Sequence, residues 1–119
     1  MSLQSQSILD GHLLPDEVLT AIEKLSSCKV SVRQTHNEDY MLIEVEGPEG
    51  LEAMHLFLRS STADDYRSVT NEPSTFVSVQ YSPFSSDVVK RLTGLLGGYF
   101  RRTEQESWTR LDPRKPQNG

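Results

Sequence analysis

Three arginines, Arg33, Arg67 and Arg101, stand at a fixed spacing of 34 residues, and each is followed four and five residues later by an amide side chain and a glutamate. A guanidinium group is planar and permanently charged, and it binds a carboxylate or phosphate through two parallel hydrogen bonds. If the segments around the arginines are copies of one structural unit, the three guanidinium groups can meet near one axis. The spacing therefore predicts a ligand-binding site for an anion at these three residues.

A second interpretation of the same arginines needs no ligand, and we favour it. Each arginine would lie on an exposed hairpin and pair across the turn with its own glutamate, which is Glu38, Glu72 or Glu106. Exposed ion pairs of this kind contribute only about 0–1 kcal/mol each to stability. The two interpretations differ in geometry, because a ligand site needs arginines around a concave surface, whereas ion pairs leave the arginines apart.

The most basic part of the chain also contains a group of aromatic residues. Tyr99 and Trp108 lie close in sequence to Arg101 and Arg110, in a segment that is predicted to fold back on itself. Tryptophan, tyrosine and arginine carry much of the binding energy of protein interfaces, so these four residues are candidate interface residues. Arg101 and Trp108 are expected to be cross-strand neighbours in cation–π contact. The same composition can bind single-stranded nucleic acid, but the net charge of the chain opposes that alternative.

Other residue patterns in the sequence do not predict catalysis or metal binding. Glu52 and His55 have the Glu-x-x-His spacing of di-metal sites in helical bundles, but such sites need a second copy and further glutamates on facing helices. Gly97 and Gly98 follow a predicted helix, so we expect them to end that helix rather than to bind phosphate. We therefore expect no catalytic residues, no metal and no cofactor.

Charge is unevenly distributed along the 119 residues, whose formal net charge is -5. Residues 1–89 contain 5 lysines and arginines against 14 acidic residues, whereas residues 90–119 contain 7 against 3. The acidic excess favours solubility or a cationic protein partner. We expect no secretory signal in residues 1–10 and no apolar stretch that spans a bilayer, and a single cysteine favours a reducing compartment. These features predict a cytoplasmic protein with one domain.

The elements that would position these side chains are helices and hairpins in alternation. A proline lies 18 or 19 residues before each spaced arginine and opens a helical pattern, at Pro15, Pro48 and Pro83. Apolar residues then recur at helical spacing, and alternating β-branched and aromatic residues follow them. The pattern predicts three helices that begin near these prolines, each followed by a two-stranded hairpin.

We therefore predict an α+β domain of three helix–hairpin (αββ) units, with a mainly antiparallel sheet and the helices on one face. The predicted domain covers residues 14–111, between a flexible N-terminal arm at 1–13 and a flexible C-terminal tail at 112–119. The alternative is a decorated ferredoxin-like plait with strands at 39–46, 66–70, 75–81 and 98–103.

These features favour a non-enzymatic protein-interaction or regulatory domain. Its acidic surface or an exposed hairpin edge would bind another chain or a second copy, since edge strands offer unpaired backbone groups. The first alternative is a small-molecule or anion-binding domain that uses Arg33, Arg67 and Arg101, and the second is an enzyme of unknown reaction. We expect neither a membrane nor nucleic acid as a partner.

Overall fold

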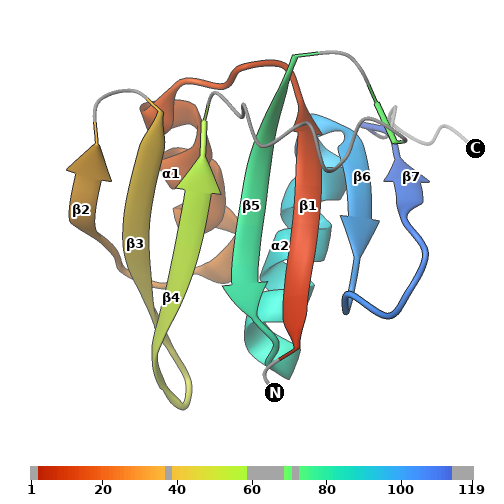
Figure 1. Cartoon of the computed structure of the whole chain (residues 1–119). Coiled ribbons are helices and arrows are strands. Elements are labelled where there is room, and N and C mark those ends of the chain that lie inside the picture. Colours follow the sequence, from red (N-terminus) through yellow and green to blue (C-terminus); the bar gives the residue numbers. More distant parts are fainter. Residues whose placement is uncertain (1–2, 37–38, 59–68, 71–72, 114–119) are drawn as a thin grey trace, which may run out of the picture.

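The computed structural model describes residues 3–36, 39–58, 69–70 and 73–113. Two helices and seven strands lie within these ranges (Figure 1). In chain order they are β1 (Gln4–Asp10), α1 (Pro15–Ser26), β2 (Val30–His36), β3 (Tyr40–Gly47), β4 (Gly50–Phe57), β5 (Ser74–Gln80), α2 (Pro83–Leu96), β6 (Gly98–Arg101) and β7 (Thr109–Leu111). The chain is therefore an α+β protein, as the sequence predicts.

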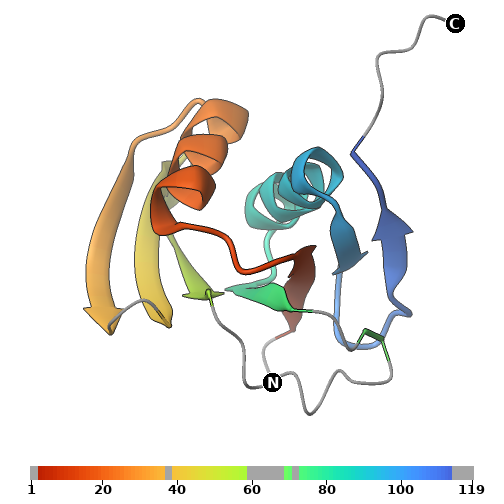
Figure 2. The same ribbon diagram turned by 90° about the horizontal axis from the view of Figure 1, so that it is seen from above.

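All seven strands form one antiparallel sheet, in the order β2-β3-β4-β5-β1-β6-β7. Both helices cover the same face of this sheet, and we call the other one the open face (Figures 1 and 2). With α1 and α2, the strands β4-β5-β1-β6 have the split β-α-β connectivity of a ferredoxin-like arrangement. The hairpin of β2 and β3 is inserted between α1 and β4, and β7 is added after β6.

The hydrophobic core lies between the sheet and the two helices. Met41, Ile43 and Val45 of β3 are buried while the residues between them are half-buried, which is the two-residue period predicted for this strand. The helices bury the apolar residues that recur at helical spacing: Val18, Ala21 and Ile22 from α1, and Val88, Val89 and Leu92 from α2. Each helix therefore packs one side on the sheet, as its sequence pattern predicts.

Local signals set the ends of the helices. Pro15 and Pro83 lie in the first turns of α1 and α2, where the N–H group that proline lacks would have no partner in the helix. The Ser82 hydroxyl accepts a hydrogen bond from the Ser85 N–H group at 3.0 Å and so caps α2. The helix ends at Gly97, whose φ is 88°, so the predicted glycine stop is confirmed.

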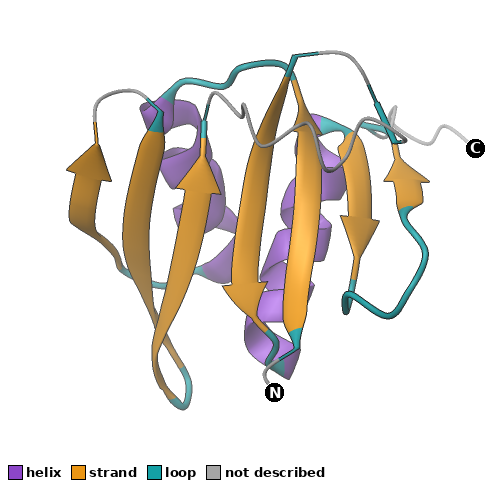
Figure 3. Cartoon of the chain, in the orientation of Figure 1, coloured by secondary structure: helices purple, strands orange, loops and turns teal. Residues whose placement is uncertain are grey.

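The second predicted helix is wrong. Residues 47–58 belong to the hairpin of β3 and β4 instead, and β4 pairs with β3 along its whole length (Figure 3). Pro48 lies in the turn of that hairpin and not in a first helical turn. Gly50, two residues later, has a positive φ. Met54 and Leu56 are fully buried with a half-buried residue between them, which is a strand period. Because apolar residues occupy both faces of this segment, periodicity alone does not separate a buried strand from a buried helix.

Two helix–hairpin units therefore stand where three were predicted. They are α1 with β2 and β3, and α2 with β6 and β7. The predicted strand at 66–70 lies largely outside the described residues, whereas its partner at 75–81 is confirmed as β5. The plait alternative named β5, α2 and β6 correctly, but its first strand, 39–46, is β3 and lies outside the four central strands.

The prediction of a flexible arm at residues 1–13 is wrong, because Gln4–Asp10 form β1, a strand in the interior of the sheet. This strand pairs with β5 along its whole length and with β6 over four residues. Its first residues are serine and glutamine, and that polarity concealed the strand in the sequence. The buried Ser7 hydroxyl is satisfied by the Thr93 hydroxyl of α2 at 2.6 Å, which allows a polar residue in the core.

Two other expectations concern the C-terminus and membranes. Most of the predicted flexible tail at 112–119 lies outside the described residues. No helix in the described part of the chain combines the length and the apolar composition that crossing a membrane requires.

Close contact between β6 and β1 requires glycine at position 98. A Cβ atom at Gly98 would lie 2.1 Å from the Ile8 carbonyl oxygen, and the φ of Gly98 is 152°. We predict that Gly98→Ala lowers the free energy of unfolding by about 3 kcal/mol, because the methyl group fits only if a strand moves. The control, Gly94→Ala in α2, has open space at its Cβ and should raise stability by about 0.5–1 kcal/mol. Urea unfolding measures both changes, and equal effects would contradict the close contact.

Candidate functional site

The spaced arginines do not meet in the part of the chain that the structure describes. Arg33 lies on the edge strand β2, where its side chain is 62% exposed and its Nε atom is 3.5 Å from Glu44 Oε1. Arg101 lies on β6, and four strands separate the two residues, which is about 24 Å at roughly 4.8 Å per strand. Arg67 lies outside the described residues. Arg33 and Arg101 therefore cannot hold one small anion between them.

The four predicted interface residues do lie together. Tyr99 and Arg110 are cross-strand partners on β6 and β7, and the guanidinium carbon of Arg110 is 5.1 Å from the centre of the Tyr99 ring. The guanidinium carbon of Arg101 is 4.4 Å from the centre of the Trp108 ring, so the predicted cation–π contact is confirmed. Tyr99 and Arg101 belong to the open face, because Phe100 between them packs in the core. We call Tyr99, Arg101, Trp108 and Arg110 the β6–β7 platform.

Hydrogen bonds fix the edge of the Arg101 guanidinium group. Its Nε atom donates to Gln6 Oε1 at 2.8 Å, its Nη2 atom donates to the same oxygen, and its Nη1 atom donates to the Glu104 carbonyl oxygen at 3.3 Å. Every nitrogen of the group is therefore engaged, and its central carbon lies over the Trp108 ring. Binding an anion through two parallel hydrogen bonds would require breaking some of these contacts.

Arg110 is held in a similar way by two carboxylates. It donates to both oxygens of Asp10, at 2.9 and 2.8 Å, and its Nε atom donates to Asp112 at 2.8 Å. The hydrogen bonds that Arg110 donates to Asp10, and then those to Asp112, raise the pKa of Arg110 above its ordinary value. The Arg110 side chain is 38% exposed, so solvent weakens these ion pairs and their main effect is to orient the guanidinium group.

A cross-strand row of apolar and aromatic residues leads from the platform across the open face. The backbone register places Tyr40, Phe57, Phe76, Ile8 and Tyr99 side by side on five neighbouring strands. Ring centres are 5.1 Å apart for Tyr40 and Phe57, and 5.8 Å apart for Phe57 and Phe76. Ile8 and Phe76 are buried, whereas Tyr40, Phe57 and Tyr99 are half-buried. The platform is therefore the end of a continuous row and not an isolated cluster.

Sequence reasoning missed the residues that orient the arginines. Gln6 and Asp10 belong to β1, which was predicted as part of a flexible arm. The available signal was weak, because only Ile8 and Leu9 of β1 are apolar although every residue from Ser5 to Leu9 is buried. Two serines in that pattern hid a strand that the sheet places between β5 and β6.

Glu52 and His55 do not form a metal-binding pair. They lie three residues apart on a strand and therefore on opposite faces of the sheet. Glu52 Oε1 accepts hydrogen bonds from the Ser82 hydroxyl at 2.9 Å and the Ser85 hydroxyl at 2.8 Å, at the N-terminus of α2. His55 Nδ1 shares a hydrogen bond with the Tyr40 hydroxyl at 2.8 Å. The Glu52 carboxylate joins β4 to a helix end, where negative charge is favourable.

Comparison with known proteins gives no relative from which a role could be transferred. No protein-family model, curated protein or solved structure matches this chain. The geometry of its side chains is therefore the basis for inferring its function.

The only tryptophan of the chain, Trp108, makes the platform directly observable. We predict that Arg101→Ala shifts the Trp108 emission to longer wavelength and increases quenching by acrylamide, because the guanidinium group no longer covers one face of the ring. The control Arg33→Ala removes an arginine at the other edge of the sheet and should leave emission unchanged. Fluorescence spectra of the folded variants test this, and identical spectra for all three proteins would contradict the contact.

The contact between β4 and α2 gives a second prediction. Glu52→Ala should lower the free energy of unfolding by about 2 kcal/mol, because two hydroxyl groups lose a charged acceptor and the helix loses an anion at its N-terminus. Glu49→Ala removes an exposed carboxylate in the neighbouring turn and should change stability by less than about 0.5 kcal/mol. Chemical denaturation compares the two, and similar midpoints would show that the Glu52 contacts contribute little.

Proposed function

We propose that this protein is a non-enzymatic interaction domain and that the β6–β7 platform is the surface to which a partner protein binds. One observation carries the proposal. The guanidinium groups of two arginines lie over the rings of Tyr99 and Trp108, while the hydrogen bonds that they donate to neighbouring groups hold them in place. The surface therefore offers aromatic and guanidinium groups in a fixed arrangement.

The composition of the platform supports protein recognition over anion binding. Tryptophan, tyrosine and arginine are enriched among the residues that dominate binding energy at interfaces. Aromatic side chains lose little conformational entropy on binding, and the platform arginines have already lost theirs to intramolecular hydrogen bonds. A partner can thus gain contact area at a small entropic cost.

The two edge strands of the sheet are poorly suited to pair with a strand of a partner protein. On the edge strand β2, the register shifts between Val32 and Gln34, and the charged Arg33 lies at that irregularity. On the other edge, β7 has three residues. Bulges, charges and short length are features that limit pairing with another strand. We therefore place the proposed contact on the open face and not on an edge.

The charge of the chain restricts the proposed partner. Asp10, Asp112 and Glu104 adjoin the platform, and the chain as a whole carries a net charge of -5. A strongly acidic partner would be repelled, whereas a neutral or basic one would be attracted. We propose a partner that presents apolar or aromatic side chains to the platform and basic groups around them.

Affinity capture with matched variants tests the proposed function. Tagged wild-type protein, Trp108→Ala and Leu51→Ala are incubated with lysate of the source organism, after circular dichroism has confirmed that each is folded. Leu51 is a suitable control because it is 63% exposed and lies on β4, away from the platform. A specific partner should be retained by wild type and Leu51→Ala and weakened at least about tenfold by Trp108→Ala, the loss expected for a hot-spot residue.

Light scattering after size exclusion covers the case in which the partner is a second copy. A wild-type dimer that Trp108→Ala converts to a monomer would support the platform as the contact. Retention of the same partner, or of the same dimer, by Trp108→Ala would overturn the proposal.

A further inference from the structure

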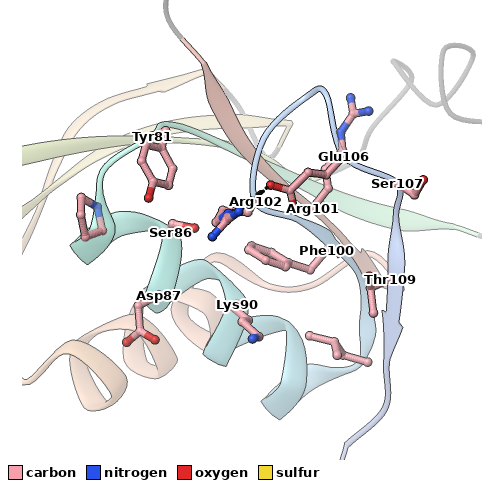
Figure 4. A pocket seen from close by; sticks show the side chains of 12 residues that line it. Tyr81, Ser86, Asp87, Lys90, Phe100, Arg101, Arg102, Glu106, Ser107 and Thr109 are labelled. Carbon is pink, nitrogen blue, oxygen red and sulfur yellow. Dashed lines mark hydrogen bonds and ion pairs between the residues drawn. The ribbon is translucent and has the colours of Figure 1, made fainter.

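A cavity of about 550 Å³ lies between the first half of α2 and the hairpin of β6 and β7 (Figure 4). It is on the helix-bearing side of the sheet, because Phe100, which lines it, packs in the core with residues of α2. Most of the platform lies on the opposite side of the same hairpin, but Arg101 belongs both to the platform and to the lining of the cavity. The volume falls within the range of about 300–1,000 Å³ that is usual for small-molecule sites.

The base of this cavity is apolar. Phe100 is 7% exposed and presents its ring there, and Leu111 of β7 lies alongside in the lining. An aromatic ring and a branched aliphatic side chain favour the flat apolar part of a ligand. The cavity therefore offers a surface on which an apolar group can exclude water.

Polar groups gather at one end of the cavity. Figure 4 shows the Ser86 hydroxyl directed toward the Arg102 guanidinium group, beside the Phe100 ring, with the Tyr81 side chain on the same side of the cavity. Ser86 is 6% exposed, and among the described residues its hydroxyl has no hydrogen-bond partner. No fully buried side-chain oxygen or nitrogen of the described residues lacks a hydrogen-bond partner, so the Ser86 hydroxyl opens into the cavity. All three side chains can donate hydrogen bonds to a bound molecule.

The charge at this end of the cavity favours an anion. Arg102, and not Arg101 as the sequence predicted, pairs with Glu106, through Nε at 3.1 Å and Nη2 at 3.0 Å to one carboxylate oxygen. The Arg102 side chain remains 61% exposed. Lys90, further along α2 in the same lining, adds a positive charge that forms no ion pair within the described part of the chain.

The remaining acidic residue of the lining does not cancel that charge. Asp87 lies 3.6 Å from Arg91, one turn further along α2, and forms an ion pair with it. Since Glu106 pairs with Arg102 and Asp87 pairs with Arg91, Lys90 adds a positive charge to the lining that these carboxylates do not offset.

We propose that this cavity binds a small organic anion that combines an apolar, preferably aromatic, body with a carboxylate or phosphate group. The body lies on Phe100 and Leu111, and the anionic group accepts hydrogen bonds from Arg102, Ser86 and Tyr81, with Lys90 nearby. Arg102 retains Glu106 as an orienting partner while its outer edge faces the ligand. The proposal does not rest on partner binding to the platform, although Arg101 belongs to both sites.

Titration of isotope-labelled protein, followed by NMR, tests the proposal with phenyl phosphate and benzoate as the probes. At least one probe should shift the amide signals of Lys90, Phe100 and Arg102 saturably and leave those of Arg33 and Glu44 unchanged. Arg102→Gln and Ser86→Ala should each weaken that binding, by about tenfold for the charged residue. Arg33→Gln, which removes an exposed arginine on β2 at the other edge of the sheet, should bind as wild type does.

Two further compounds, each of which lacks one of the two parts of the proposed ligand, complete the test. Phenol lacks the anionic group and inorganic phosphate lacks the apolar body, so both should bind at least about tenfold more weakly than phenyl phosphate. The proposal is overturned if neither probe binds, if Arg102→Gln binds both probes as tightly as wild type, or if inorganic phosphate binds as well as phenyl phosphate.

Discussion

The pairing of β1 with both β5 and β6 is the interaction on which the rest of the structure depends. This strand comes first in the chain, yet it occupies an interior position and hydrogen-bonds to two strands from the second half of the sequence. Such contacts close long loops, and their entropic cost is repaid only when the whole sheet forms. Gly98 makes the pairing possible, because its missing side chain lets β6 lie against the Ile8 carbonyl oxygen.

The two faces of β1 then serve two different layers. On the helix-bearing face, Ser7 bonds to Thr93 of α2 and Leu9 joins the core. On the open face, Gln6 holds Arg101 and Ile8 continues the row of apolar residues. The alternation of side chains along a strand accounts for this division. A shift of β1 by one residue would exchange the faces and remove the partner of Arg101.

The hairpin of β6 and β7 is too short to form a stable surface by itself. Its strands have four and three residues, and isolated two-stranded hairpins are at best marginally stable in water. Residues of β1 stabilise it from outside, because Gln6 binds Arg101 and Asp10 binds Arg110. The same strand β6 carries the platform on one face and Phe100, at the base of the cavity, on the other. A partner on the platform and a ligand in the cavity would therefore both contact β6, and Arg101 belongs to both surfaces.

Local sequence features determined those elements whose signals act within a few residues. Pro15 and Pro83 predicted the two helices, Gly97 predicted a helix end, and the spacing around Trp108 predicted its contact with Arg101. These predictions succeeded because first-turn prolines, positive-φ glycines and neighbouring strands of a hairpin depend on local geometry.

Only the tertiary structure decided what depends on pairing between distant segments. Residues 50–57 are apolar on both sides, and their pairing with β3 and β5, not their own pattern, makes them a strand. The polar β1 is a strand because β5 and β6 satisfy its backbone. Sheet order also separates Arg33 from Arg101 and brings Tyr40, Phe57 and Tyr99 into one row. Equal spacing along a chain places residues together only when the intervening elements repeat, and here a strand stands where the repeat required a helix.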